Sequence, residues 1–165
     1  MPPHALFSDA RTIRAAGLSL NILCQQLSDS TVLAMIETGT TVECLFLDPN
    51  GRAVQERERE EGHGPGYLST LTIINIQALG RLRQQLPSTA RHRLHVRVYD
   101  ETLRYNLTFV DDSLGVVQPY LHRSRGVDAP AFVFHRDNHR TTGLYPAFDQ
   151  VYTWLREQSV EHDHN

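Results

Sequence analysis

The stretch Leu103–Leu121, LRYNLTFVDDSLGVVQPYL, decides the fold. Apolar and polar residues alternate on both sides of an acidic turn that begins at Asp111. This pattern predicts two strands, Arg104–Val110 and Gly115–Tyr120, joined as a tight hairpin. A hairpin of this kind needs neighbouring strands, so the rest of the chain is expected to supply a larger sheet.

Upstream of the hairpin, the pattern alternates between helix and strand. A short helix is expected at Ser8–Arg14 and a first strand at Leu18–Cys24, and SDSTVLAMIETG (residues 28–39) has a serine cap and an apolar face typical of a helix. The apolar run TTVECLFL (residues 40–47) predicts a buried strand that ends at Asp48, before a Pro-Asn-Gly turn. Strand, helix and strand in this order indicate the start of a parallel α/β sheet.

The remaining elements complete one domain. Leucine spacing after Tyr67 predicts a long amphipathic helix that ends before Pro87, and RLHVRVYD alternates as a strand over Arg93–Asp100. A short strand is expected in PAFVFHRD and a closing helix in LYPAFDQVYTWLREQ. The sequence therefore predicts a single α/β domain over residues 1–160, a mixed, mostly parallel sheet flanked by helices, with a disordered tail at 161–165.

Residues 52–66, RAVQEREREEGHGPG, interrupt the apolar pattern. Arginine and glutamate alternate before a Gly/Pro-rich break, and no core residue is evident after Val54. A solvated loop or helix explains this composition, and a mobile flap over a site, Arg57–Gly66, is the alternative.

Composition limits the classes of function. The net charge is only −3, no apolar run reaches the ~20 residues of a membrane span, and the N-terminus lacks the order of a secretory signal. We therefore expect a cytoplasmic protein with no membrane partner. Cys24 and Cys44 lie in apolar segments and are expected to be buried and reduced. All 16 basic residues are arginine, which excludes lysine-dependent chemistry.

The order of elements and the hairpin resemble one half of a phospholipase D-like protein. In that family a strand carries His-x-Lys, four further residues and Asp; here RYNLTFVD places Arg104, Asn106 and Asp111 at these positions. The family's next polar segment corresponds to Gln118 and Tyr120. The resemblance implies a phospholipase D-like half-domain without its nucleophile, because arginine is not deprotonated in proteins. No catalytic residue is therefore assigned.

A second resemblance covers residues 5–157. GLSLN, LFLDPNG, YNLTFVDD and QPYLHRSRGVD together are similar to an uncharacterised C-terminal domain of bacterial transcriptional regulators with a phage-repressor-like (XRE family) DNA-binding unit. This likeness implies a regulatory module that meets DNA only through an attached unit, which this chain does not contain.

The candidate site follows from the predicted sheet. Ligands bind at the carboxyl ends of parallel strands, where Asn21, Asp48 and Asn106 are expected to meet. Arg104 and Asn106 are two residues apart on a strand and are expected to share a face. The candidate ligand-binding set is Asn21, Asp48, Arg104, Asn106, Asp111, Gln118, Tyr120 and Arg125. Guanidinium and amide groups suit a small phosphate-containing anion. Alternatively, Arg104 pairs with Asp48 or Asp111 in a structural ion pair, and Arg125 bonds Asp128 across a turn.

Other chemistry has weaker support. The nearest histidine pairs, His135/His139 and His162/His164, lack the spacing of a metal site, so neither a metal nor a cofactor is expected. The arginines between residues 81 and 97 indicate a solvated face, with nucleic-acid binding as the alternative.

Three functions follow from the sequence. The first is a non-catalytic, ligand-sensing domain of a transcriptional regulator that binds a small anionic ligand. The second is a phosphodiesterase or nuclease-like enzyme that works without the histidine. The third is a homodimerisation module, and a homodimer is compatible with the other two.

Overall fold

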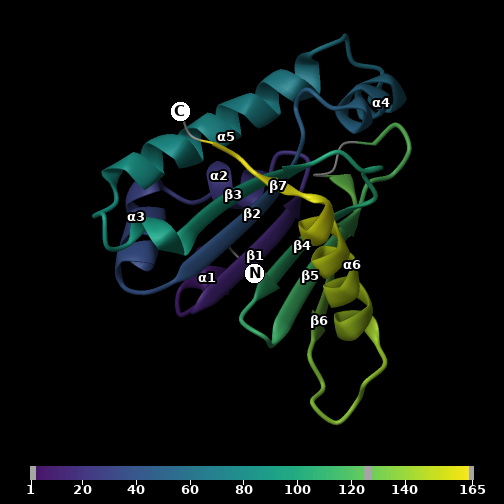
Figure 1. Cartoon of the computed structure of the whole chain (residues 1–165). Helices are drawn as coiled ribbons and strands as arrows, with labels where there is room; N and C mark the ends of the chain where they lie inside the picture. The colour runs from purple at the N-terminus through teal and green to yellow at the C-terminus, as the bar shows by residue number, and fades with distance from the viewer. Residues whose placement is uncertain (1–2, 125–127, 164–165) are drawn as a thin grey trace.

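A computed structural model describes residues 3–124 and 128–163. The elements, in chain order, are α1 (Pro3–Phe7), β1 (Thr12–Gly17), α2 (Asn21–Cys24), α3 (Asp29–Glu37), β2 (Thr41–Leu47), α4 (Arg52–Glu61), α5 (Tyr67–Gln85), a 3-10 turn η1 (Arg91–Arg93), β3 (Leu94–Tyr99), β4 (Tyr105–Val110), β5 (Leu114–Pro119), β6 (Phe132–His135), α6 (Leu144–Gln158) and β7 (Val160–Glu161). Figure 1 shows one twisted sheet with helices packed on it. Among the described residues, no helix combines the length and apolarity needed to cross a bilayer.

The sheet has seven strands in the order β6-β5-β4-β1-β2-β3-β7. The β1–β2 and β2–β3 pairs are parallel, and the other four pairs are antiparallel. The predicted α/β class and the hairpin are confirmed, but the sheet is not mostly parallel. The reason is that β4, β5 and β6 lie beside β1 in alternating directions, and that β7 runs against β3.

The first strand lies earlier than predicted. β1 is Thr12–Gly17, whereas the expected strand at Leu18–Cys24 is a loop followed by α2. The expected helix at Ser8–Arg14 is instead a turn that leads into β1, and a short helix, α1, precedes it. Ala15 and Ala16 are at most 1% exposed because both faces of β1 are covered. A strand buried on both faces lacks the alternation that marks a half-exposed one.

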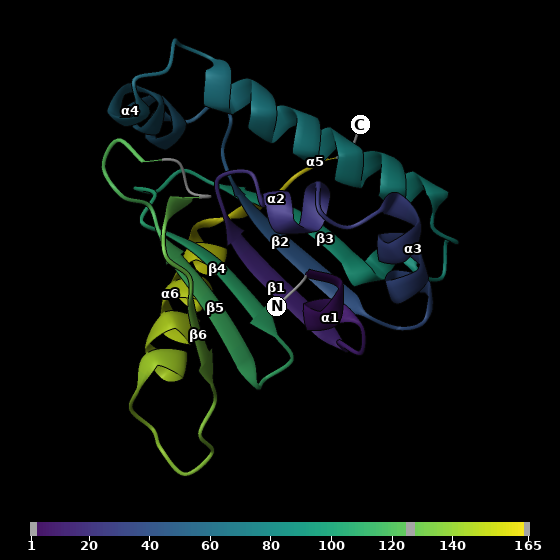
Figure 2. The ribbon, with the colours of Figure 1, turned by 180° about the vertical axis from the view of Figure 1, so that it is seen from behind.

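Two apolar cores lie on opposite faces of the sheet. In Figure 2, α1, α2 and α3 lie in front of β1 and β2, and α6 lies behind β4 and β5. The first core joins α3 and α5 to β1 and β2 around Ile13, Ile36 and Ile76. The second core joins α6 to β4 around Phe109 and Tyr152, which stack edge to face with ring centroids 6.0 Å apart. This sandwich leaves the ends of the strands free to form a site.

The C-terminal segment extends the sheet. Val160 and Glu161 pair with Val98 and Arg97 of β3, and the His162 amide donates to the Val96 carbonyl at 2.9 Å. Ordered chain thus continues past the boundary expected at residue 160. The last two residues of the expected tail lie outside the described residues.

Both cysteines are free thiols, as the sequence indicated. Burial raises the pKa of Cys24 to about 12 and raises that of Cys44 as well. Because the thiolate is the reactive form, we expect iodoacetamide at pH 8 to label both cysteines much more slowly in the native protein than in urea. Mass spectrometry measures the labelling rates. Equal rates in the native protein and in urea would contradict this burial.

Candidate functional site

A cavity of about 560 Å³ lies at the carboxyl end of β1, between α1, α2, α5 and the β4–β5–β6 meander. We call it the β1 pocket. Part of its wall is apolar, including Leu18, Leu20, Leu68, Leu71, Val116 and Val133. Its polar groups come from the segment after β1, the α4–α5 loop and the meander, and include Ser19, Asn21, His63, Asn106, Gln118 and Tyr120. A mainly apolar cavity with a few convergent polar groups is typical of a small-molecule site.

Four of the predicted site residues meet in this pocket. Asn21 begins α2, after the short loop that follows β1, and Asn106 pairs with Gln118 across the hairpin, with Tyr120 just beyond. Gly17 ends β1 beside Asn106, and a Cβ atom at Gly17 would lie only 3.2 Å from the Asn106 Oδ1. A side chain at position 17 would therefore require the Asn106 amide or the Leu20 side chain to shift by a few tenths of an ångström.

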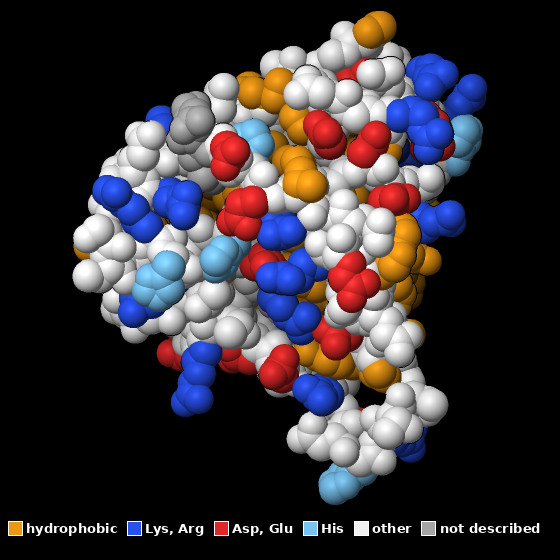
Figure 3. Space-filling model, viewed as in Figure 1, with side chains coloured by type: hydrophobic (Ala, Val, Ile, Leu, Met, Phe, Trp, Pro, Cys, Tyr) orange, Lys and Arg blue, Asp and Glu red, His pale blue; other side chains and the backbone are white. Residues whose placement is uncertain are grey.

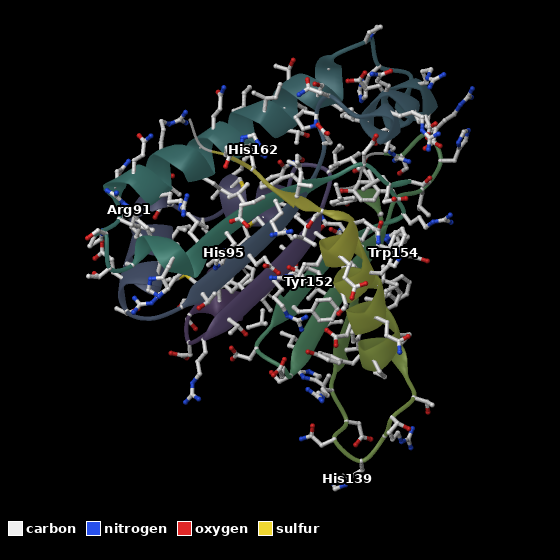
Figure 4. All side chains as sticks on the ribbon, in the orientation of Figure 1. Arg91, His95, His139, Tyr152, Trp154 and His162 are labelled. Atoms are coloured by element: carbon white, nitrogen blue, oxygen red, sulfur yellow. The ribbon has the colours of Figure 1, made fainter. Side chains whose placement is uncertain are left out.

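Arg104 does not join them. It lines a smaller cavity of about 110 Å³ on the α6 face, together with Glu101 and Trp154. Trp154 extends from α6 in Figure 4. The expectation that Arg104 and Asn106 share a face is wrong, because β4 begins only at Tyr105 and strand alternation does not apply to the residue before it.

Asp48 and Asp111 hold turns. The Asp48 Oδ1 accepts from the Asn50 amide at 2.9 Å, within the turn after β2. Asp111 lies at the opposite end of β4 from Asn106, where its Oδ1 accepts from the amides of Arg11 and Thr12 at 2.8 and 2.9 Å. Neither residue lines the β1 pocket. Within the described residues, no ion pair joins Arg104 to either aspartate. Arg125 lies outside the described residues.

Asp111→Ala is expected to lower the free energy of unfolding by about 1 kcal/mol, because two backbone amides lose their acceptor. Asp111 also has a φ of 51°, which alanine adopts less readily than aspartate. The neighbouring Asp112, whose side chain is 81% exposed, supplies the matched control Asp112→Ala. Chemical denaturation of both variants measures the difference. Equal denaturation midpoints would show that the Asp111 side chain does not stabilise the fold.

The loop that floors the β1 pocket is fixed from α5. The Asn75 side chain is 2% exposed, and its Nδ2 donates to the Ser19 carbonyl at 2.6 Å and to the Asn21 Oδ1 at 3.1 Å. The Thr72 hydroxyl donates to the Leu18 carbonyl at 3.2 Å. Two residues that do not face the ligand space thus set the position of the loop.

Tyr120 ties the same loop to the meander. The Leu18 amide donates to the Tyr120 hydroxyl oxygen at 3.2 Å. Burial raises the pKa of Tyr120 to about 12, so the phenol stays protonated near neutral pH. The neutral hydroxyl therefore keeps a proton that it can donate to a ligand.

A charged network borders the pocket through α4. Arg57 is 3% exposed; its Nε donates to the Glu61 Oε1 at 2.7 Å, and its guanidinium lies 5.2 Å from the Tyr120 ring centroid. The other Glu61 oxygen lies 3.1 Å from the His63 Nε2, and His63 stacks on Tyr67. The expected solvated segment is thus a helix with a buried inner face, held to the domain.

Glu61 and His63 were not among the residues predicted for the site. The signal was the Arg57–Glu61 spacing of four residues, which places the two side chains on one face of a helix, followed by Gly62 and His63. The alternating charges of this segment made the spacing hard to recognise, because the same composition is typical of a solvated surface.

The other histidines and arginines were considered in the sequence as possible metal ligands or as a nucleic-acid surface. No group among the described residues has the three ligands needed to hold a metal ion, and in Figure 4 His139 lies at the tip of the β6–α6 loop, far from His95. Arg97 pairs with Glu161 at 2.9 Å. On the face seen in Figure 3, acidic side chains lie among the arginines, which fits a solvated surface.

Comparison with other proteins defines the fold. A family model described as "Domain of unknown function (DUF5919)" matches residues 1–161, and no curated protein matches the chain. Phosphatidylserine synthase of Haemophilus influenzae Rd KW20 superposes on 95% of this chain with a TM-score of 0.62 and 14% identity. Nuc of Salmonella typhimurium, a phospholipase D family member, superposes on 97% with a TM-score of 0.55 and 11% identity. The chain spans 35% of the synthase and 88% of Nuc. These likenesses show a phospholipase D-like fold.

Proposed function

The chain belongs to the DUF5919 family and has a phospholipase D-like fold, and we propose that it binds a small molecule in the β1 pocket without cleaving it. The role we assign is that of a sensor or regulatory domain. We expect the domain to act on DNA only through a separate DNA-binding unit, as the resemblance to the regulators implies.

One observation carries the proposal. The chain departs from the phospholipase D pattern at both positions of the His-x-Lys pair. The two replacements lie at different cavities: Arg104 on the α6 face and Asn106 in the β1 pocket. A covalent phosphoryl transfer needs a nucleophile and an anion-holding group at one phosphorus atom. Asn106, which stands at the lysine position, supplies with Asn21 and Gln118 amides that hold a ligand and do not attack it.

Thermal unfolding with a panel of nucleotides, sugar phosphates, inorganic phosphate and neutral amphiphiles tests the proposal. By linkage, a bound compound at ~100 times its Kd adds about 2.7 kcal/mol to the free energy of unfolding. We expect Val116→Trp, which fills the β1 pocket, to abolish this stabilisation, and Val160→Trp, on the exposed strand β7, to retain it. Mass spectrometry should recover the bound compound unchanged. A panel without any stabilising member, or a shift that survives Val116→Trp, would contradict the proposal.

A hydrolytic enzyme is the second candidate, favoured by His63 at the pocket. Its Nε2 lies 3.1 Å from the Glu61 carboxylate, as a general base oriented by an acid does. In that case the wild-type protein would hydrolyse a generic phosphodiester such as bis(p-nitrophenyl) phosphate, and His63→Ala would remove the activity. Our proposal expects no hydrolysis above the buffer rate.

A further inference from the structure

We infer that the β1 pocket takes an uncharged ligand whose polar end is a planar, amide-like group and whose body is apolar. This inference rests on the proposed function and names the class of ligand. It differs from the phosphate-containing ligand that the sequence favoured, and the groups that line the pocket are the reason.

The polar side chains of the pocket present both donors and acceptors. The Asn21 Oδ1 already accepts from the Ser19 hydroxyl at 3.0 Å and from Asn75, so its Nδ2 is left as a donor. The Gln118 Nε2 donates to the Ala129 carbonyl at 3.3 Å, which leaves its Oε1 as an acceptor. The Tyr120 oxygen accepts from Leu18, so its hydroxyl proton is a second donor. Donors and an acceptor are thus available together.

Asn106, on β4, adds a further amide to this set. Within the described residues its side-chain amide has no hydrogen-bond partner, although the residue is half-buried. Its Nδ2 and Oδ1 can therefore both serve a ligand, as a donor and an acceptor side by side. An amide, lactam or similar planar group presents the complementary acceptor and donor.

Electrostatics disfavours an anion at the same place. No arginine lines the pocket within the described residues, and Glu61 contributes a carboxylate to its border. The nearby Arg57 is engaged by Glu60, Glu61 and the carbonyls of Leu121 and Ser124. A phosphate would exchange its hydration for neutral amides beside a cation that is already paired, which is costly in a partly buried site.

The rest of the cavity suits an apolar body. Leu18, Leu68, Leu71 and Val116 line it, and its volume of about 560 Å³ far exceeds that of a polar head alone. Burial of an aliphatic chain against these side chains is the main source of affinity, and the amides select the head group.

Calorimetric titration with three ligands of equal chain length tests the inference: octanamide, octanoate and octyl phosphate. We expect octanamide to bind the wild-type chain at least about tenfold more tightly than the two anions. The reason is that only the neutral amide head offers both the acceptor and the donor that the side-chain amides of the pocket need. Asn106→Leu should weaken octanamide binding at least about tenfold, which is the loss of one buried hydrogen-bonded pair. Asn138→Leu, in the exposed β6–α6 loop, is the matched control and should leave the affinity unchanged.

The outcomes separate the inference from the proposed function. Anions that bind as tightly as octanamide, with the same dependence on Asn106, would overturn the neutral class and leave a ligand-binding pocket in place. Octanamide that binds Asn106→Leu as well as the wild type would overturn the assigned amide contacts. If none of the three ligands binds, the inference is overturned. The thermal-unfolding panel with Val116→Trp then decides whether the pocket binds any small molecule.

Discussion

Replacement of Arg57 by methionine is expected to lower the free energy of unfolding by about 3–5 kcal/mol, because it leaves the buried Glu61 carboxylate without its arginine. The Arg57 and Glu61 side chains are 3% and 6% exposed, and the Arg57 Nη2 also donates to the carbonyls of Leu121 and Ser124 at 3.0 and 2.8 Å. The substitution keeps the length of the aliphatic stem and removes the charge and four hydrogen bonds. Urea denaturation measures the loss.

A matched control exists on the same helix. Arg59 is exposed, and its Nε reaches only the Gln55 carbonyl, at 3.3 Å. Arg59→Met is expected to change stability by less than about 0.5 kcal/mol. Similar losses in the two variants would show that α4 is a solvated helix, as its composition suggested, and that Arg57 does not anchor it.

Asn75→Leu is the second large effect that we expect, and it acts on stability and binding together. The leucine fits the volume of the buried amide but leaves the Ser19 carbonyl without its donor, a loss of about 1–3 kcal/mol. The loop from Leu18 to Asn21 then loses its fixed position, so ligand affinity should fall although Asn75 itself does not line the pocket. Denaturation and calorimetry on the same protein measure the two effects.

Gln77→Leu is the control for this substitution, since Gln77 is an exposed amide on the same helix. It should leave both quantities unchanged. An Asn75→Leu protein that is less stable but binds octanamide as tightly as the wild type would show that Asn75 supports the fold alone and does not position the pocket.

Local pattern predicted much of the fold. The predicted hairpin strands begin and end within one residue of β4 and β5, and the apolar spacing predicted α5 and α6. The reason is that, in half-buried strands and amphipathic helices, the spacing of the apolar residues follows the buried face. β1 was misplaced because TIRAAG is covered on both faces and has no alternation. The antiparallel pairing of β1 with β4 depends on a contact between residues ~95 positions apart, which no local pattern encodes.

The site was predicted in part for the same reason. Asn106, Gln118 and Tyr120 belong to one hairpin, so strand pairing brought them together as expected. Arg104 was assigned to the wrong face because the exact start of β4 decides where it points. His63 reaches the pocket only through the return of the chain from α4 into α5, which the sequence does not reveal. The homodimer, the cytoplasmic location and the link to a DNA-binding unit stay predictions.

The central claim is that the ligand site lies in the β1 pocket at Asn106 and not beside Arg104. Two-dimensional NMR of the ¹⁵N-labelled chain titrated with octanamide tests it directly, through the side-chain amide signals of Asn21, Asn106 and Gln118 and the indole signal of Trp154. We expect saturable shifts of the three amide signals, with the Trp154 signal unmoved. Shifts confined to Trp154, at the Arg104 cavity, would contradict it.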